Sequence, residues 1–98
     1  MIVRIVQMTF RADKTDEFVA MFNERKDRIR HFAGCTHLEL WQDKKQPEIF
    51  FTYSHWESET ALDHYRFSEF FKETWGLTKA MFAAPPQAWS VLQRYDVA

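Results

Sequence analysis

The sequence contains very little cysteine and glycine, and these absences limit the kinds of site that it can build. Its single cysteine, Cys35, cannot form an internal disulfide, which agrees with a reducing compartment and a cytoplasmic protein. With two glycines it has no glycine-rich phosphate loop, and no HExxH, CxxC or nucleophile-elbow motif occurs. The nucleotide, structural-zinc and common hydrolase sites that depend on these motifs are therefore not predicted.

Long apolar runs and a surplus of either charge are also missing. The first ten residues, MIVRIVQMTF, alternate in the manner of a strand and lack both a basic leader and a long hydrophobic stretch. We therefore expect neither a signal peptide nor a membrane span. Lysine and arginine number 13 against 14 acidic residues, and the basic residues are spread along the chain. Because no basic stripe results, nucleic acid is not an expected partner.

Aromatic residues, by contrast, are abundant. The chain has 10 phenylalanines, 4 tryptophans and 3 tyrosines in 98 residues. Each ring removes ~150–250 Å² from water when it is buried, whereas a chain of this size buries only somewhat over ~60% of its unfolded surface. We expect a single domain over residues 1–98 whose surplus rings cover a second copy of the chain or line a ligand cavity.

The spacing of apolar residues predicts a first strand over 2–10 and a helix that begins near Asp13 and ends at Gly34. Strands over 35–42 and 48–56 follow, and the polar turn DKKQP joins them as a hairpin. Both faces of the first strand are substantially apolar. This pattern is typical of a sheet that is covered by helices on one side and by a second subunit on the other.

A second helical region begins after Ser58, which is well placed as its N-cap. The apolar stripe changes phase near 66–68, which predicts a break, and Ser68 is suited to cap the second piece. The prolines at 85–86 end the helical run, and the last strand is expected over 87–95. This order predicts an α+β, ferredoxin-like βαββαβ subunit with one antiparallel sheet. Face-to-face pairing of two such sheets would form a homodimeric α+β barrel.

Three residues are candidates for a chemical site, each with a plainer alternative. Trp56 ends an apolar strand at a strand-to-helix corner, where its ring either stacks on a flat ligand or packs in the core. His64 lies next to Tyr65 on the following helix and is either a pocket residue or a partly exposed helix histidine. Gln7 interrupts the apolar first strand, and its amide needs a partner in a ligand or a neighbouring side chain. The four histidines share no helical face, so no metal site is predicted.

A resemblance to a known family is carried by three segments: FAGCTHLELWQD (32–43), FFTYSHWESETALDHYRFSEFF (50–71) and AWSVLQ (88–93). In the second segment a tryptophan is followed by an acidic, serine-containing helix start, then by Ala-Leu, a histidine and Ser-x-x-Phe. Because these residues occur in this order and at this spacing, the chain resembles the antibiotic biosynthesis monooxygenase domain family over essentially its whole length.

The resemblance implies a dimeric α+β barrel with a pocket between sheet and helices in each subunit. It also implies a monooxygenase that needs no cofactor and oxidises a small aromatic phenol, quinol or anthrone, because an electron-rich phenolate itself reduces dioxygen. Trp56 would stack on the substrate, His64 would accept a proton and Gln7 would orient an oxygen. Further substrate contacts are expected from four residues: Phe22, Tyr65, Phe71 and Trp75.

Two alternatives stay open. A haem-degrading branch of the family resembles this chain but uses an asparagine on the first strand, the corner tryptophan and a histidine ligand on the following helix. Gln7 falls near that asparagine, and Trp56 matches the tryptophan. Trp75, however, stands where the iron-ligating histidine is expected, and His64 lies about three helical turns earlier, which disfavours haem degradation. The second alternative is a noncatalytic dimer that binds a small ligand.

Overall fold

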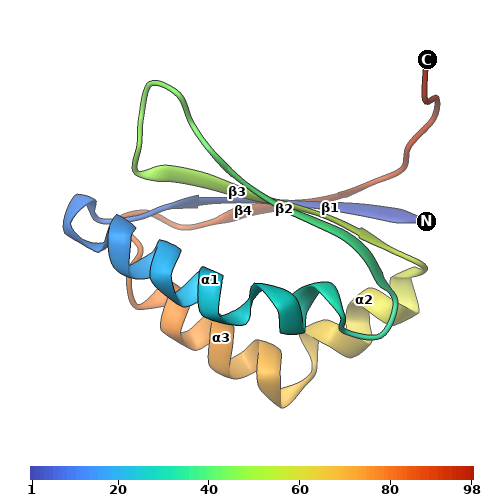
Figure 1. Cartoon of the computed structure of the whole chain (residues 1–98), viewed down its shortest axis with the longest axis horizontal. Helices are drawn as coiled ribbons and strands as arrows, with labels where there is room; N and C mark the ends of the chain where they lie inside the picture. Colours follow the sequence, from blue (N-terminus) through green and yellow to red (C-terminus); the bar gives the residue numbers. More distant parts are fainter.

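A four-stranded antiparallel sheet with helices on one of its faces forms the framework of the structure (Figure 1). The computed structural model describes all residues from 1 to 98. The strands are β1 (Ile2–Thr9), β2 (Cys35–Gln42), β3 (Ile49–Trp56) and β4 (Gln87–Val91). They follow the order β2-β3-β1-β4 across the sheet, so that β1 and β3 are central. The predicted ferredoxin-like α+β arrangement is therefore confirmed.

Three helices cover one face of this sheet. They are α1 (Thr15–Arg30), α2 (Glu59–Arg66) and α3 (Glu69–Lys79), and the short 3-10 turn η1 (Ala12–Lys14) precedes the first of them. The separate α2 and α3 confirm the predicted break. Both predicted caps are also present: Ser58 Oγ accepts a hydrogen bond from the Ala61 N–H at 3.1 Å. Ser68 Oγ accepts one from the Phe71 N–H, also at 3.1 Å. No helix of this structure has the length and apolar character that a membrane crossing requires.

The last strand is shorter than the prediction over 87–95. It ends at Val91, which pairs with Val3 of the antiparallel neighbour β1. Because β1 itself begins at Ile2, the partner strand extends only one position beyond this pair, and the residues after Leu92 have no ladder to join. The prediction of strand structure beyond Val91 is therefore wrong.

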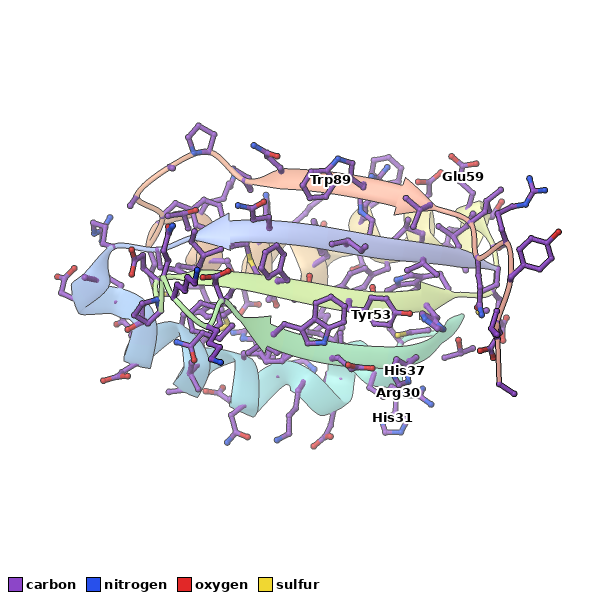
Figure 2. The ribbon with its side chains drawn as sticks, turned by 90° about the horizontal axis from the view of Figure 1, so that it is seen from above. Arg30, His31, His37, Tyr53, Glu59 and Trp89 are labelled. Atoms are coloured by element: carbon purple, nitrogen blue, oxygen red, sulfur yellow. The ribbon has the colours of Figure 1, made fainter.

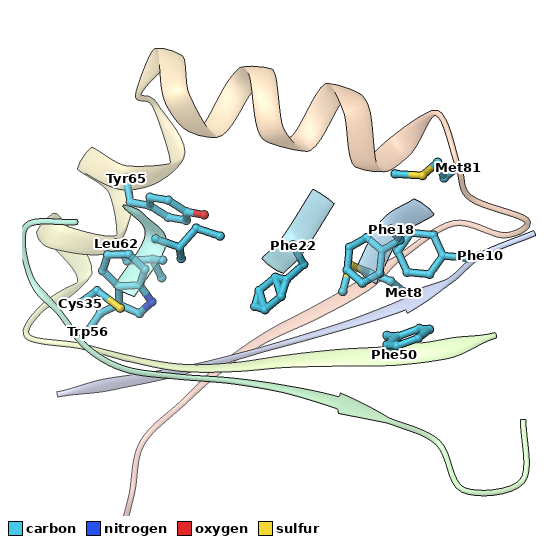
Figure 3. Close-up of a cluster of buried hydrophobic side chains, with 11 residues drawn as sticks. Met8, Phe10, Phe18, Phe22, Cys35, Phe50, Trp56, Leu62, Tyr65 and Met81 are labelled. Carbon is cyan, nitrogen blue, oxygen red and sulfur yellow. The ribbon is translucent and has the colours of Figure 1, made fainter. Parts of the chain in front are cut away.

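The core lies between the sheet and the helices and contains two aromatic groups (Figure 3). In the first, Phe10 is 1% exposed and stacks on Phe18, with 4.1 Å between the ring centroids. In the second, Trp56 is also 1% exposed and stacks on Tyr65 at 4.8 Å. Phe22 lies between the two groups in Figure 3. The sheet and helices are thus held together at both ends of the interior, because large buried rings dominate the apolar contact of a small core.

The opposite face of the sheet carries no helix (Figure 1). Side chains alternate along a strand, so this face receives Ile5 of β1 and its cross-strand neighbours Tyr53 and Trp89. Figure 2 looks onto this face and shows Tyr53 and Trp89 on it. Trp41 stacks on Tyr53 with 4.8 Å between the centroids, and Trp41 and Trp89 are 40% and 42% exposed. We call this the open face.

Gly34 makes the tight approach between the α1–β2 connection and α2. Its φ of +89° lies in the left-handed region, and a Cβ placed there would stand 2.4 Å from the Cβ of Ala61. The Gly34 carbonyl also accepts a hydrogen bond from the Glu57 N–H at 2.8 Å. Only a residue without a side chain meets both requirements, because left-handed backbone is costly for other residues and the space is already filled.

We therefore expect Gly34→Ala to lower the free energy of unfolding by about 2–4 kcal/mol, through backbone strain and overpacking together. Gly76→Ala is the matched control, since Gly76 lies within α3 and a Cβ there would meet nothing within 4 Å. That variant should gain roughly 0.5–1 kcal/mol from higher helix propensity. Urea denaturation of both variants measures the two effects, and equal effects of one sign would contradict this account of Gly34.

Candidate functional site

A cavity of about 320 Å³ lies between the sheet and the three helices. Its size falls at the lower end of the range found for small-molecule sites, which are mostly apolar with a few polar groups. Of the 21 residues that line it, 13 are hydrophobic. Lining residues come from both aromatic groups of the core, so the cavity spans the interior between them. A small, largely apolar ligand is the kind of molecule that fits such a space.

Alternation along the central strands determines which of their side chains reach this cavity. Every second residue of β1 and β3 points toward the helices, and these positions supply Arg4, Val6, Met8, Thr52, Ser54 and Trp56. The edge of the sheet adds Leu38 of β2, Ala88 of β4 and the preceding Pro86. The helices supply the rest of the wall at helical spacing, with Phe18, Met21, Phe22, Arg25, Ile29, Leu62, Tyr65, Arg66, Phe71, Thr74, Trp75 and Thr78.

Trp56 contributes a flat apolar wall whose polar atom is already satisfied. Its Nε1–H donates to Ser54 Oγ at 3.0 Å, and both residues are buried. The indole also stacks on Tyr65. Because the N–H has a partner within the protein, Trp56 offers a ligand its ring surface and no free donor.

Tyr65 brings a hydroxyl group to the same region. Burial raises the pKa of Tyr65, so the side chain stays a neutral phenol that can donate a hydrogen bond. Figure 3 shows its oxygen pointing toward the middle of the core. Ser68 Oγ donates a hydrogen bond to the backbone carbonyl of Tyr65 at 2.7 Å. No side chain forms a hydrogen bond with the Tyr65 hydroxyl. The hydroxyl is therefore a donor without a protein partner beside the cavity.

The helix wall contains a polar network around Arg25 that runs from the buried Thr74 to the exposed Glu73. Arg25 Nη1 donates to Thr74 Oγ1 at 2.8 Å, and its Nη2 donates to Glu73 Oε1 at 2.9 Å. The Arg25 guanidinium holds the pKa of the Glu73 carboxyl below its usual value. The Nε of Arg25 is buried and has no hydrogen-bond partner. One buried polar atom of this network is thus left without a hydrogen-bond partner.

Five of the seven predicted site residues line the cavity: Phe22, Trp56, Tyr65, Phe71 and Trp75. The structure does not bring Gln7 and His64 to it. Gln7 lies between the inward-facing Val6 and Met8 and therefore points to the open face. His64 is exposed on α2, whose buried side is formed by other residues. The chemical roles given to all seven residues stay predictions.

Sequence reasoning missed the arginines and hydroxyl residues of the lining. A signal was present in β1, where Arg4 occupies the same face as the apolar Val6 and Met8. A charged residue at such a position must either leave the core or meet a partner there. Ser54 gave a similar signal inside a strand that is rich in aromatic residues.

With this geometry established, comparison with known proteins identifies the family. A family model described as antibiotic biosynthesis monooxygenase matches residues 1–75, which is most of the chain. The chain belongs to the antibiotic biosynthesis monooxygenase family. The match ends within α3, so it includes β1, β3 and Trp75 of the cavity wall.

Solved structures agree with the family on the fold. The crystal structure of an antibiotic biosynthesis monooxygenase has a TM-score of 0.88 at 22% identity, covering 95% of this chain and 98% of that one. A conserved protein from Methanosarcina mazei Go1 also has a TM-score of 0.88, at 21% identity, with 96% and 94% covered. A Mycobacterium tuberculosis protein has 0.88 at 15% identity, with 99% and 98% covered. A search of curated proteins finds no match.

Identities this low show the fold alone, because one fold hosts many functions. Family membership and fold together support a monooxygenase-type or small-ligand-binding module. The chemistry of the residues that line the cavity is what distinguishes a monooxygenase from a small-ligand-binding module and indicates the class of ligand.

Proposed function

We propose that this chain binds a small aromatic phenol, quinol or anthrone in the cavity and oxidises it with dioxygen, without a metal or organic cofactor. The observation that carries the proposal is the cavity itself, a space of about 320 Å³ with aromatic walls and a free hydroxyl donor on Tyr65. Membership of a monooxygenase family supports the same reading.

The proposed chemistry needs few protein groups, because the substrate supplies the electrons. An anthrone CH₂ becomes a carbonyl with one oxygen atom of O₂, and the other oxygen leaves as water with the two hydrogens. A quinol instead loses two electrons and two protons to O₂, which gives a quinone and hydrogen peroxide. Trp56, Phe71 and Trp75 would hold the ring, and the Tyr65 O–H would donate to a substrate oxygen.

A second candidate, noncatalytic binding of the same ligands, is favoured by one specific observation. The cavity lining contains no histidine, aspartate, glutamate or lysine. A side chain that accepts a proton at neutral pH is therefore missing from the wall, and His64 and Gln7 do not border the cavity. Oxidation by this chain would have to proceed with the substrate and dioxygen exchanging protons with water.

The lining does not fit a haem. Neither histidine nor cysteine borders the cavity, and Trp75 cannot bind iron. Tyr65 could in principle ligate as a phenolate, but burial raises its pKa and disfavours that form. We therefore derive no step through haem.

The proposal includes a homodimer formed through the open face. Support comes from the aromatic row across its centre, in which Ile5 lies between Tyr53 and Trp89. Trp41 and Trp89 expose large fractions of their rings there, and contiguous apolar surface of this kind is uncommon on monomers. A second copy presents the same surface, so a two-fold pairing is self-complementary.

Oxygen uptake tests the catalytic proposal. With hydroquinones, naphthalenediols and anthrone, in the presence of EDTA, the protein should raise uptake above the protein-free rate. Trp75→Ala should lower the added rate at least about tenfold, which corresponds to ~1.4 kcal/mol of lost substrate contact. Leu77→Ala should leave it unchanged, because Leu77 lies on the same helix but outside this cavity. Ligand-induced thermal stabilisation without any added uptake would support noncatalytic binding and contradict the oxidase proposal.

A further inference from the structure

Arg4 is the one arginine of the cavity wall that has no acidic partner. Arg25 pairs with Glu73 at 2.9 Å, and Arg66 pairs with Asp63 at 3.0 Å. The half-buried Arg4 donates only to the neutral Ser90 Oγ, at 3.0 Å. A guanidinium has five N–H donors, so most of its hydrogen-bonding capacity is unused. These donors are free to bind an anionic group that enters the cavity, and hydrogen bonds to charged groups are the strong ones.

The charge of Arg66 adds to this imbalance. Burial lowers the pKa of Arg4, and the positive charge of Arg66 lowers it further. The two guanidinium groups therefore act on each other, and both residues line the same cavity. Asp63 offsets the charge of Arg66, but no aspartate or glutamate borders the cavity to offset the charge of Arg4. An anionic group placed between Arg4 and Arg66 would relieve their repulsion and replace the missing counter-charge.

We propose that the cavity selects aromatic monoanions, meaning a carboxylate or an ionised phenol attached to a ring, and that Arg4 and Arg66 bind the anionic group. This inference rests on the cavity being the ligand site of the proposed function and names the charge class of the ligand. It does not depend on whether the ligand is oxidised.

The neighbours of Arg4 place a ring surface close to the charge. Arg4 pairs across the sheet with Ser54, whose Oγ holds the Trp56 indole. A ligand ring that lies against Trp56 and Tyr65 can thus extend its anionic substituent toward Arg4 along the sheet. A carboxylate matches the planar guanidinium fork with two hydrogen bonds, whereas a phenolate oxygen accepts them at one atom.

Calorimetric titration with a matched pair of ligands tests the inference. The probes are 1-naphthoate and its neutral isostere 1-naphthamide, which share ring, shape and size. The wild-type protein should bind 1-naphthoate about ten- to a hundredfold more tightly, the usual effect of hydrogen bonds to charged groups. Equal affinities would overturn the charge selection and leave aromatic binding in the cavity standing. Binding of neither probe at millimolar concentration would overturn both the selection and the ligand site.

Variants then locate the selection on Arg4. Arg4→Gln should reduce the preference, with weaker binding of 1-naphthoate and unchanged binding of 1-naphthamide. Arg94→Gln removes the same charge from the C-terminal segment, outside the cavity, and should keep the wild-type preference. A thermal melt of each variant shows that it is folded. An Arg4→Gln protein that is folded and keeps the full wild-type preference for 1-naphthoate would overturn the assignment, as would an equal loss of preference in Arg94→Gln.

Discussion

Trp56→Ala should lower the free energy of unfolding by about 3–5 kcal/mol, the usual cost of removing a large buried ring. Trp56 is 1% exposed, stacks on Tyr65 and donates its indole N–H to the buried Ser54 Oγ. The substitution removes the buried ring, its stacking contact with Tyr65 and its hydrogen bond to Ser54 together, and it leaves a void beside an existing cavity. Urea denaturation followed by far-ultraviolet circular dichroism measures the change.

Trp56→Phe is the control that keeps this prediction testable if the alanine variant does not fold. Phenylalanine retains much of the ring surface but leaves Ser54 Oγ without its donor, so we expect a smaller loss of about 1–3 kcal/mol. A loss below about 1 kcal/mol for Trp56→Ala would contradict the close packing described around this corner.

Ile5→Lys should convert the proposed dimer into a monomer. Ile5 lies at the centre of the open face, between Tyr53 and Trp89. A lysine there would place an unpaired charge in the middle of the interface, at a cost of about 3–5 kcal/mol, which weakens association between roughly a hundredfold and several thousandfold. Size-exclusion chromatography with light scattering at micromolar concentration should show one subunit mass in place of two.

Leu77→Lys is the matched control for the dimer. Leu77 is also apolar and 46% exposed, but it belongs to α3 on the helical side of the molecule. This variant should keep the wild-type mass. A wild-type protein that is monomeric at these concentrations would contradict the proposed dimer, and so would a Leu77→Lys variant that dissociates while Ile5→Lys does not.

The fold could be predicted from the sequence because its signals are local and agree with one another. Gly34 marks the turn after α1, and Ser58 and Ser68 mark the starts of two helices, each through a backbone requirement that few residues meet. The end of β4 could not be predicted this way. It depends on where β1 begins, because Val91 pairs with Val3 near the start of that strand.

The cavity was only partly predictable, for a related reason. Phe71 and Trp75 share one helical stripe and were expected to face inward together, as they do. When both faces of a central strand are apolar, the two-residue alternation of side chains does not tell which face meets the helices. The direction of Gln7 is therefore not determined by the sequence. The sequence does not single out Arg4, because an arginine is usually a solvent-exposed charge, and only the three-dimensional arrangement shows that its counter-charge is missing.

The four tryptophans offer the most direct test of the central claim, that the interior cavity is the ligand site. Trp56 and Trp75 line the cavity, whereas Trp41 and Trp89 lie on the open face. In a protein labelled with ¹⁵N at the indoles, titration with 1-naphthol should shift the Trp56 and Trp75 signals and leave the other two in place. Shifts confined to Trp41 and Trp89, or no shift at all at millimolar 1-naphthol, would contradict the claim.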